Sequence, residues 1–432
     1  MQLKIESLAY GGDGVARTPE GQTVFIPDTC PGDVVEATVV QDRGRWAKAR
    51  LTSIVEASPD RVSPSCPYFG ECGGCQWQHV AYTAQLKAKR QAVMDALGRI
   101  GGLDTEALVE PCISSEREYG YRNKIELRAD DTGPATLGMT ARDGRTIIPI
   151  DRCLLLPKKH AGAPRKIRGA LKFVAGDQDL GLKRVGLRFA ERRSDIEIAI
   201  WTTPGPFPRS LATKTLTDSI QATSVVRVLT KGPDKARRVS KVEVLAGKGS
   251  WRERLSGFTM GISAPSFFQV NTATAEKLVS TALDALDPSE DDVVLDCYSG
   301  AGTFTLKLAE RSDDVVAIEA SSAAIQDLRR NLENAGLHAD VIGGDATREL
   351  PGLGEFDRIL VDPPRAGLTP EALIALASAG ASRIVYVSCD PATLARDAGA
   401  LDAQGYTLTR VTPVDLFPQT YHVESVAVFD RS

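Results

Sequence analysis

The chain has 432 residues, of which 42% are hydrophobic, and its 52 Lys and Arg stand against 56 Asp and Glu for a net charge of -4. This length exceeds that of one compact domain, so we expect two or three domains, each large enough to bury a core. The first residues lack the basic and then apolar layout of a signal peptide, and no stretch reaches the roughly 18 to 20 uncharged apolar residues of a membrane span. We therefore expect a cytoplasmic protein without a membrane partner.

Residues 1–58 consist of short alternating segments separated by Gly and Pro turns, such as "QTVFIP" and "DVVEATVVQ". This pattern predicts a small β-barrel of the OB kind, a fold that often binds nucleic acid but also serves as a plain structural module. The next residues are rich in Pro, Ser and Gly, which indicates a linker. Apolar residues at helical spacing then predict a helix over residues 79–101.

Strand-like segments dominate from about Tyr119 to Leu255, and this middle region is basic. Residues 157–193 contain eleven Lys or Arg against three Asp or Glu, and residues 226–255 contain nine against three. Such runs are often solvated faces. Two of them, interleaved with Phe and Trp, favour a surface that binds a polyanion.

After about Met260, buried-strand runs alternate with helical segments, among them "DVVLDCYSG", "DVVAIEA", "FDRILVDPP" and "RIVYVSCD". Near-continuous Val, Ile and Leu strands in this arrangement predict a parallel sheet covered on both faces, which is a doubly wound α/β fold. We therefore predict three domains, namely a β-barrel over 1–58, a mostly β central domain over 59–258 and an α/β domain over 259–432.

The predicted strand ends of the α/β domain carry glycine and acidic residues, and ligands of such sheets bind beyond the carboxyl ends of the strands. Gly300 and Gly302 follow the first strand and permit a close approach of the backbone, whereas Glu319, Asp345 and Asp362 end the next three. Glu319 is placed to accept hydrogen bonds from the ribose hydroxyls of an adenosine, and Asp345 to reach the adenine amino group. A nicotinamide dinucleotide is an alternative, but its third glycine is missing and acidic strand ends repel phosphates. S-adenosylmethionine, which has no phosphates, fits better.

The segment "RIVYVSCDPATLARD" brings Cys389 from a buried strand into a turn just before Pro391, a residue that suits the first turn of a helix. A helix amino terminus lowers the pKa of a thiol and favours the thiolate, although buried cysteines in strands are commonly inert. Thiolate addition to carbon 6 of a pyrimidine makes carbon 5 electron-rich enough to accept a methyl group. A base must then remove the carbon 5 proton, and the candidate is Glu424 at the head of the last strand. The alternative for Glu424 is a surface position on an edge strand.

Four segments in chain order, "DCYSGAGTF", "VDPPRAGL", "VSCDPATLARD" and "FPQTYHVESVAVF", resemble motifs of the RNA uracil-5 methyltransferase family. The resemblance covers most of the chain and implies that Cys389 is the nucleophile and Glu424 the base. It places Phe267 near the target base and assigns contacts with the cofactor to Gln269, Tyr298, Thr303, Glu319, Asp345 and Asp362. Asp390 replaces the usual Asn of the family and adds a negative charge beside the nucleophile, and Tyr421 replaces a common first His.

Three cysteines, Cys66, Cys72 and Cys75, form a C-x5-C-x2-C pattern, and Cys153 is the candidate for a fourth ligand. Four thiolates suit zinc as well as an iron-sulfur cluster, and unligated thiols are a third interpretation. The spacing resembles the iron-sulfur branch of the same family, which implies a [4Fe-4S] cluster with a structural role.

The resemblance also identifies the barrel as a TRAM domain, an OB-like RNA-binding module. It implies that "YGYRNKIELR" lines the RNA path with Arg122, Asn123 and Lys124, any of which is otherwise an ordinary exposed strand residue. The implied reaction is methylation of a uridine in 23S rRNA, with tRNA as the alternative substrate, by a monomeric enzyme.

Other functions fit the motifs less well. An RNA cytosine-5 methyltransferase usually has a Pro-Cys pair at the fourth strand, where this chain has "DPPR". An adenine amino-methyltransferase would need an aromatic residue after the two prolines. A non-catalytic RNA-binding protein would need neither Cys389 nor Glu424.

Overall fold

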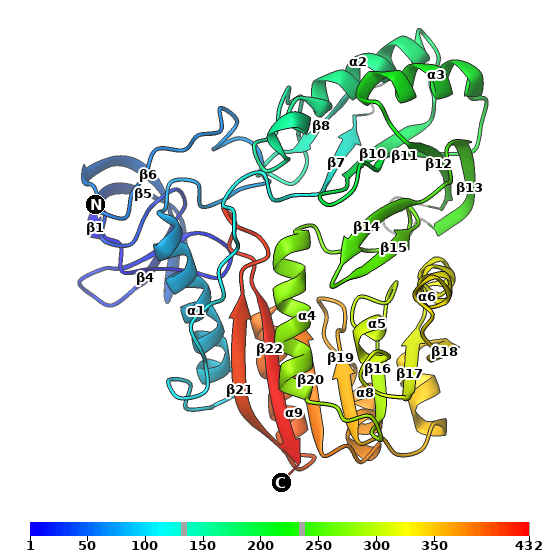
Figure 1. Ribbon diagram of the computed structural model, residues 1–432. Coiled ribbons are helices and arrows are strands. Elements are labelled where there is room, and N and C mark those ends of the chain that lie inside the picture. Colours follow the sequence, from blue (N-terminus) through cyan, green and yellow to red (C-terminus); the bar gives the residue numbers. More distant parts are fainter. Residues whose placement is uncertain (131–135, 233–237, 432) are drawn as a thin grey trace.

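The computed structural model describes residues 1–130, 136–232 and 238–431, and it contains three large sheets (Figure 1). The barrel and the central sheet lie toward the carboxyl ends of the parallel strands in the C-terminal sheet. Within the described residues, no helix combines the length and the apolar character needed to cross a bilayer.

The first sheet is a closed barrel. Its strands are β1 (Gln2–Lys4), β2 (Ser7–Leu8), β3 (Gly14–Arg17), β4 (Thr23–Ile26), β5 (Val34–Asp42) and β6 (Trp46–Glu56), in the order β1-β5-β6-β4-β3-β2. β1 pairs with β5 at one end of this order, and β2 pairs with β3 at the other end. Because β1 and β2 follow one another directly in the chain, the sheet closes on itself. The strands lie where the sequence predicts a small barrel.

The central sheet is mixed, and helices cover one of its faces. Its strands are β7 (Lys124–Ala129), β8 (Leu137–Thr140), β9 (Ile147–Ile148), β10 (Leu182–Phe189), β11 (Ile196–Thr202), β12 (Ser224–Lys231) and β13 (Arg238–Ala246). Two helices, α2 (Ala163–Ala175) and α3 (Arg209–Ile220), pack Ile167, Leu171 and Leu216 against it. The region is mostly β, as the sequence predicts, but these two helices were not predicted; apolar residues at helical spacing give each of them a face that packs on the sheet.

The C-terminal sheet has seven strands in the order β18-β17-β16-β19-β20-β22-β21. They are β16 (Val293–Cys297), β17 (Asp314–Glu319), β18 (Asp340–Gly343), β19 (Arg358–Val361), β20 (Arg383–Ser388), β21 (Tyr406–Val414) and β22 (Glu424–Arg431). The five strands from β18 to β20 are parallel, whereas β22 runs antiparallel to both of its neighbours. The sequence predicts the parallel strands correctly but not this reversal.

Both faces of the C-terminal sheet are covered, as the continuous apolar strands predict. The helices are α4 (Thr272–Leu286), α5 (Thr305–Leu308), α6 (Ser322–Ala335), α7 (Ala346–Glu349), α8 (Pro370–Ser378) and α9 (Pro391–Asp402), and β14 (Trp251–Leu255) pairs with β15 (Phe258–Ile262) as a hairpin. Val294 and Val385 pack with α4 and α6 on one face, and Leu295 and Ile384 pack with α8 and α9 on the other. The doubly wound α/β fold is confirmed.

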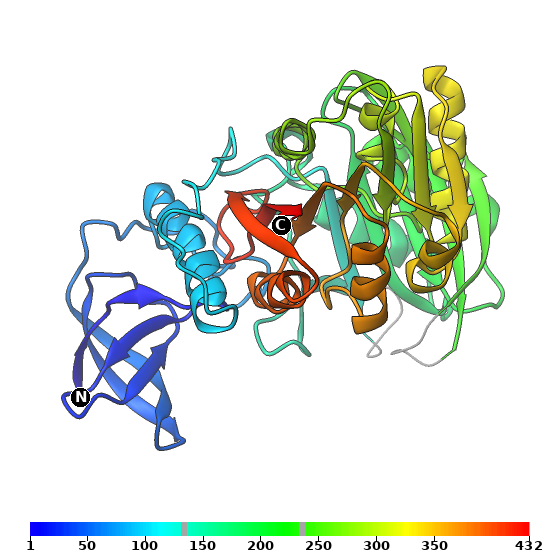
Figure 2. The same ribbon diagram turned by 90° about the horizontal axis from the view of Figure 1, so that it is seen from below.

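One helix, α1 (Tyr82–Arg99), lies between the barrel and β21 in both views (Figures 1 and 2). Its residues Val93 and Leu97 are fully buried in the core that contains α8 and α9. The chain after α1 runs alongside the edge strand β21, with parallel bridges from Val109 to Val411 and from Ile113 to Val414. A stretch of the second predicted domain thus shares the core of the third.

Candidate active site

Strand pairing brings Cys389 and Glu424 together at one edge of the C-terminal sheet. In the antiparallel pair of β20 and β22, Ser388 lies opposite Ser425. Cys389 directly follows the first of these serines and Glu424 directly precedes the second. The register therefore makes the thiol and the carboxyl neighbours, although 34 residues separate them in the chain.

A capped helix begins immediately after the cysteine. The Asp390 carboxylate accepts hydrogen bonds from the backbone N–H of Ala392 at 3.0 Å and of Thr393 at 3.1 Å, and Pro391 occupies the first turn of α9. An acidic residue is a favourable cap, since it pairs with free N–H groups and with the positive end of the helix dipole. The negative charge of Asp390 thus stabilises the first turn of α9.

Burial changes the electrostatics that the sequence predicts for the cysteine. Burial raises the pKa of the Cys389 thiol to about 12, the Glu424 carboxylate raises it further, and the Arg365 guanidinium lowers it. The prediction of a pKa lowered by the helix amino terminus is therefore wrong for the protein without RNA. A thiolate in a desolvated position beside a carboxyl group is costly, and this cost raises the pKa.

The two carboxyl groups near the thiol also favour their neutral forms. Glu424 is 4% exposed, and burial followed by the nearby Asp362 raises its pKa well above its usual range. Burial raises the pKa of Asp362 to about 7, with a further contribution from Asp296. Glu424 is not a surface residue on an edge strand, because β22 lies between β20 and β21.

Three further residues lie near the pair: Arg365 and His422 belong to the motifs "VDPPRAGL" and "FPQTYHVESVAVF", whereas no sequence pattern points to Tyr10. The Arg365 guanidinium donates to His422 Nδ1 at 3.0 Å, and burial, followed by that cation, lowers the pKa of His422 to about 4. The imidazole is therefore neutral and accepts the hydrogen bond. Tyr10, from a loop of the barrel, donates its hydroxyl to the Cys389 carbonyl oxygen at 3.2 Å and packs edge-on against Tyr421.

The predicted cofactor residues lie along the adjacent strand ends. Glu319 accepts from the backbone N–H of Gly300 at 2.9 Å and of Ser321 at 2.6 Å, so it joins the ends of β16 and β17. Tyr298 adopts a positive φ of 67° at the start of the glycine turn, and Asp345 lies close enough to contribute to a raised pKa of Tyr298, after burial and Cys297. Asp345 itself is exposed and caps α7, and Thr303 lies half-buried in the turn before α5.

Two buried polar atoms near this rim have no hydrogen-bond partner in the described part of the chain. They are Gln269 Oε1, on a side chain 4% exposed, and Asp296 Oδ1, on a side chain that is fully buried. Unpaired buried acceptors are costly, so such atoms are expected where a ligand supplies the donor. Their chemistry fits the amino and hydroxyl groups of an adenosylated cofactor.

Asn123 supports the cofactor segment rather than a surface. Its side chain is 2% exposed and donates to the Gln269 carbonyl oxygen at 2.9 Å and to Thr272 Oγ1 at 3.0 Å. The prediction that Asn123 lines the RNA path is therefore wrong, because its side-chain amide is buried and donates both of its hydrogen bonds to groups inside the protein. Phe267, by contrast, is 66% exposed and free to approach a base.

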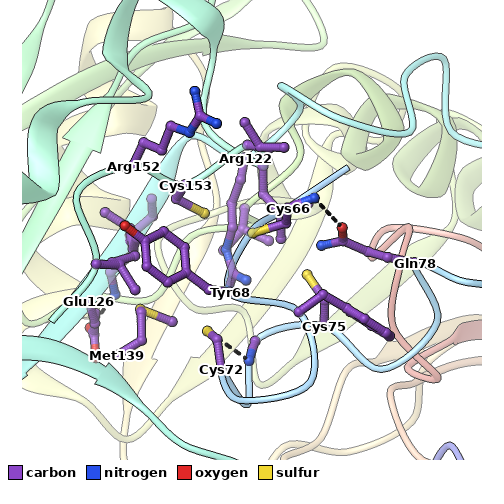
Figure 3. Close-up of a pocket in the computed structure, with 18 of the residues that line it drawn as sticks. Cys66, Tyr68, Cys72, Cys75, Gln78, Arg122, Glu126, Met139, Arg152 and Cys153 are labelled. Carbon is purple, nitrogen blue, oxygen red and sulfur yellow. Dashed lines mark hydrogen bonds and ion pairs between the residues drawn. The ribbon is translucent and has the colours of Figure 1, made fainter. Parts of the chain in front are cut away.

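Cys66, Cys72, Cys75 and Cys153 line one cavity of about 320 Å³, and all four are free (Figure 3). Burial raises the pKa of Cys75 to about 12, and each of the other three sulfurs adds to that rise, which shows that the four lie near one another. The Cys72 sulfur accepts from the backbone N–H of Gly74 at 3.4 Å. Among the described residues, no three His, Cys, Asp or Glu side chains converge on a single metal-ion position.

The remaining predicted RNA residues border the same cavity. Arg122, Lys124 and Phe267 all line it. Lys124 pairs with Glu126 at 2.8 Å, and burial lowers the pKa of this lysine. The cysteine cavity thus adjoins the segment that carries Phe267 and Gln269.

Three family models match parts of the chain. They are described as "tRNA (Uracil-5-)-methyltransferase" over residues 353–432, "TRAM domain" over residues 1–52 and "Conserved hypothetical protein 95" over residues 272–390. The first of these matches contains both Cys389 and Glu424.

Similar proteins extend over the whole chain. An "Uncharacterized RNA methyltransferase" from Gloeobacter violaceus is 36% identical over 100% of this chain and 96% of its own length. A protein of the same description from Thermosynechococcus vestitus is 34% identical over 100% and 98%. The solved structure of a tRNA (uracil-54, C5)-methyltransferase from Pyrococcus abyssi, in complex with S-adenosyl-L-homocysteine, has a TM-score of 0.77 and 28% identity and covers 99% of this chain and 100% of that chain.

The raised pKa of Cys389 predicts slow alkylation in the absence of RNA. The rate of its reaction with iodoacetamide, followed by peptide mass spectrometry, should rise with pH beyond pH 10, because the thiolate fraction keeps increasing below a pKa of about 12. Arg365→Met removes a cation that lowers this pKa, so the rate at a fixed pH should fall about three- to tenfold. Arg365→Lys is the charge-preserving control. A plateau near pH 8, or an unchanged rate in the Met variant, would contradict these electrostatics.

Proposed function

The chain belongs to the RNA uracil-5 methyltransferase family, and we propose that it methylates carbon 5 of a uridine in RNA through a covalent adduct with Cys389. The observation that carries the proposal is the register of β20 and β22, which makes Cys389 and Glu424 neighbours. A thiol nucleophile and a carboxylate base at one position are the two protein groups that substitution at carbon 5 requires.

The two side chains act at different stages of the proposed reaction. The Cys389 thiol gives its proton to solvent water, and its sulfur forms a bond to carbon 6, which moves the electron pair of the ring double bond onto carbon 5. S-adenosylmethionine supplies the methyl group that carbon 5 takes. Glu424 then removes the proton from carbon 5, the double bond re-forms and the bond between carbon 6 and sulfur breaks. Glu424 must be ionised to accept this proton, and the burial that raises its pKa makes the ionised carboxylate a stronger base.

S-adenosylmethionine is the proposed methyl donor, held along the strand ends by Gln269, Tyr298, Thr303, Glu319, Asp345 and Asp362. The unpaired acceptors of Gln269 and Asp296 support this assignment. So does the complex of the Pyrococcus abyssi enzyme with the demethylated form of this cofactor.

Two grooves whose linings contain more Lys and Arg than Asp and Glu support RNA as the substrate. One is lined by exposed Lys48 and Arg50 of the barrel and extends to Tyr421, which contacts both Tyr10 and His422. The other lies between α2 and α3, where Arg165, Lys166 and Lys214 surround Phe173, which is 66% exposed. Cationic side chains bind phosphates, an exposed ring stacks on bases, and the target uridine must leave its stack to reach Cys389. Part of the second basic stretch, residues 233–237, lies outside the described residues.

We propose 23S rRNA as the substrate, on the resemblance of the cysteine spacing to the iron-sulfur branch. Transfer RNA is the second candidate, because the family model over residues 353–432 and the solved Pyrococcus abyssi structure both carry the description of a tRNA enzyme.

The four clustered cysteines are proposed to hold a [4Fe-4S] cluster. Zinc is the alternative for four thiolates. A cavity of about 320 Å³, lined by all four cysteines, has room for a cluster with its own sulfides. The N–H bond to the Cys72 sulfur is of a kind that stabilises ligating thiolates in such sites.

To test the substrate, the protein is incubated with labelled cofactor and total RNA from cells that lack this enzyme. The rRNA and tRNA are then separated and digested to nucleosides. Label in 5-methyluridine from the 23S rRNA fraction is expected. Label in 5-methyluridine from the tRNA fraction alone would show that tRNA, not 23S rRNA, is the substrate, and it would leave the proposed reaction at carbon 5 unchanged. Label in 5-methylcytidine or a methyladenosine would overturn the proposed reaction.

The roles of the two reacting groups predict different defects. Cys389→Ala should reduce turnover by more than about a thousandfold, because the proposed adduct at carbon 6 cannot form without its sulfur. Glu424→Gln should allow attack but not proton removal, so a covalent complex of protein and RNA should accumulate on denaturing gels. Cys30→Ser, at a buried cysteine of the barrel, should turn over normally. Release of product by the Gln variant at the parent rate would show that another base operates.

The cluster is tested by metal analysis of protein purified without oxygen. We expect about four irons per chain and a brown colour, and we expect Cys75→Ser to lose both while Cys112→Ser keeps them. One zinc per chain and no iron would contradict the cluster.

A further inference from the structure

The loop that leads into Glu424 is held mainly from outside the C-terminal sheet. This loop, residues 415–423, connects β21 to β22, carries His422 and ends directly before Glu424. Gln419 in its middle has a positive φ of 71°, a conformation that is costly for a residue with a side chain. Such a backbone conformation persists only where its surroundings fix it. The contacts of the loop therefore determine the position of Glu424.

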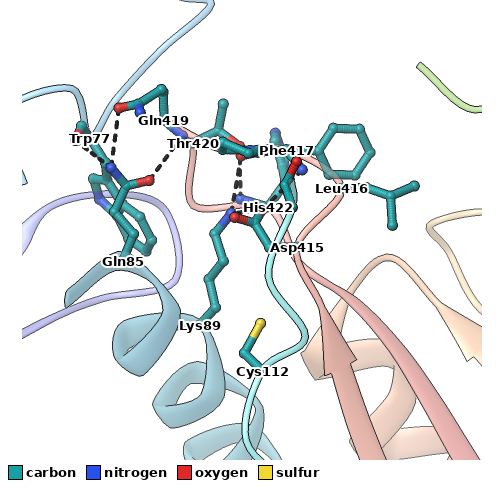
Figure 4. Close-up of polar contacts among 12 residues, drawn as sticks. Trp77, Gln85, Lys89, Cys112, Asp415, Leu416, Phe417, Gln419, Thr420 and His422 are labelled. Carbon is teal, nitrogen blue, oxygen red and sulfur yellow. Dashed lines mark hydrogen bonds and ion pairs between the residues drawn. The ribbon is translucent and has the colours of Figure 1, made fainter. Parts of the chain in front are cut away.

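A buried ion pair with α1 anchors the start of the loop (Figure 4). Lys89 Nζ lies 2.5 Å from Asp415 Oδ1, and both side chains are fully buried. The same ammonium group donates to the Phe417 carbonyl oxygen at 3.0 Å, and Asp415 Oδ1 accepts from the Phe417 N–H at 3.0 Å. One lysine thus contacts the loop at both Asp415 and Phe417.

A second pair of contacts from the same helix fixes the middle of the loop. The Gln85 amide donates to Gln419 Oε1 at 3.1 Å and accepts from the Gln419 N–H at 2.9 Å, with Gln85 fully buried. The Gln419 carbonyl oxygen accepts from the N–H groups of Gln76 and Trp77, each at 3.0 Å. Figure 4 shows Gln85 and Lys89 on one face of α1, both pointing at the loop.

Stability alone is a weak explanation for these groups. A buried ion pair loses much of its attraction to desolvation, and apolar residues of similar size often stabilise a fold as well or better. What a buried pair adds is a defined position, because each charge tolerates only one arrangement of partners. The helix that carries both residues is itself fixed in the core of the sheet by Val93 and Leu97.

We propose that Lys89 and Gln85 are positioning residues for proton removal, which hold the loop so that the Glu424 carboxyl faces carbon 5 of the uracil bound to Cys389. The inference rests on the proposed function, and it assigns to α1 a part in one step of the reaction. Neither residue contacts the thiol or the RNA base. Their loss should therefore impair the step that uses Glu424 more than the attack by Cys389.

Covalent complex formation separates this role from a general structural one. Lys89→Met should slow turnover more than tenfold, and the covalent complex of protein and RNA should accumulate on denaturing gels, as expected for Glu424→Gln. A variant that is merely unfolded forms no complex. Lys87→Met, at an exposed lysine on the same helix, is the matched control and should resemble the parent in both assays.

Two further variants control for the possibility that Lys89→Met loses activity because it does not fold. Lys89→Met combined with Asp415→Leu leaves no unpaired buried charge, and Gln85→Leu keeps the ion pair intact. Both should be folded by circular dichroism and should accumulate the complex. Folded variants that turn over normally, or that lose turnover without any complex, would overturn the inference. If Glu424→Gln itself forms no complex, the proposed role of Glu424 as the base fails. If it does while the α1 variants do not, only the positioning role fails.

Discussion

The pairing of β20 with β22 is the constraint on which the site depends. Only an antiparallel strand with Ser425 opposite Ser388 places Glu424 next to Cys389. Because β22 is inserted between β20 and β21, the pair lies inside the sheet and is desolvated. The raised pKa values of both groups follow from that position, and so does the need for the nearby cation Arg365.

The rest of the chain completes this site rather than merely carrying RNA to it. Tyr10 reaches from the barrel to the Cys389 carbonyl group, and α1 holds the loop before Glu424 through Gln85 and Lys89. The central sheet supports the segment that carries Gln269 through Asn123. The barrel, helix and central sheet therefore each fix a different part of the reacting geometry, which fits the observation that similar proteins match the chain over its full length.

Local patterns in the sequence predicted much of this structure. Apolar runs located the parallel strands, and the turn that carries Cys389 lies between a strand and a helix that begins at Pro391, as the sequence predicts. The antiparallel insertion of β22 could not be predicted, because the apolar pattern of a strand does not show whether it pairs parallel or antiparallel with its neighbours. Contacts such as Tyr10 with Cys389 and Gln85 with Gln419 join residues more than 300 positions apart and have no periodic signal. The pKa of Cys389 was misjudged for the same reason, since burial and the Glu424 carboxyl are properties of the fold.

The most direct test of the covalent mechanism uses RNA in which uridine is replaced by 5-fluorouridine. Fluorine cannot leave carbon 5 as a cation, so the ring should remain bound after methyl transfer, whichever base operates. Mass spectrometry of the digested complex should find one nucleotide on Cys389, with one added methyl group. A nucleotide attached to another residue, or no covalent complex under conditions in which ordinary RNA is methylated at carbon 5, would contradict the account.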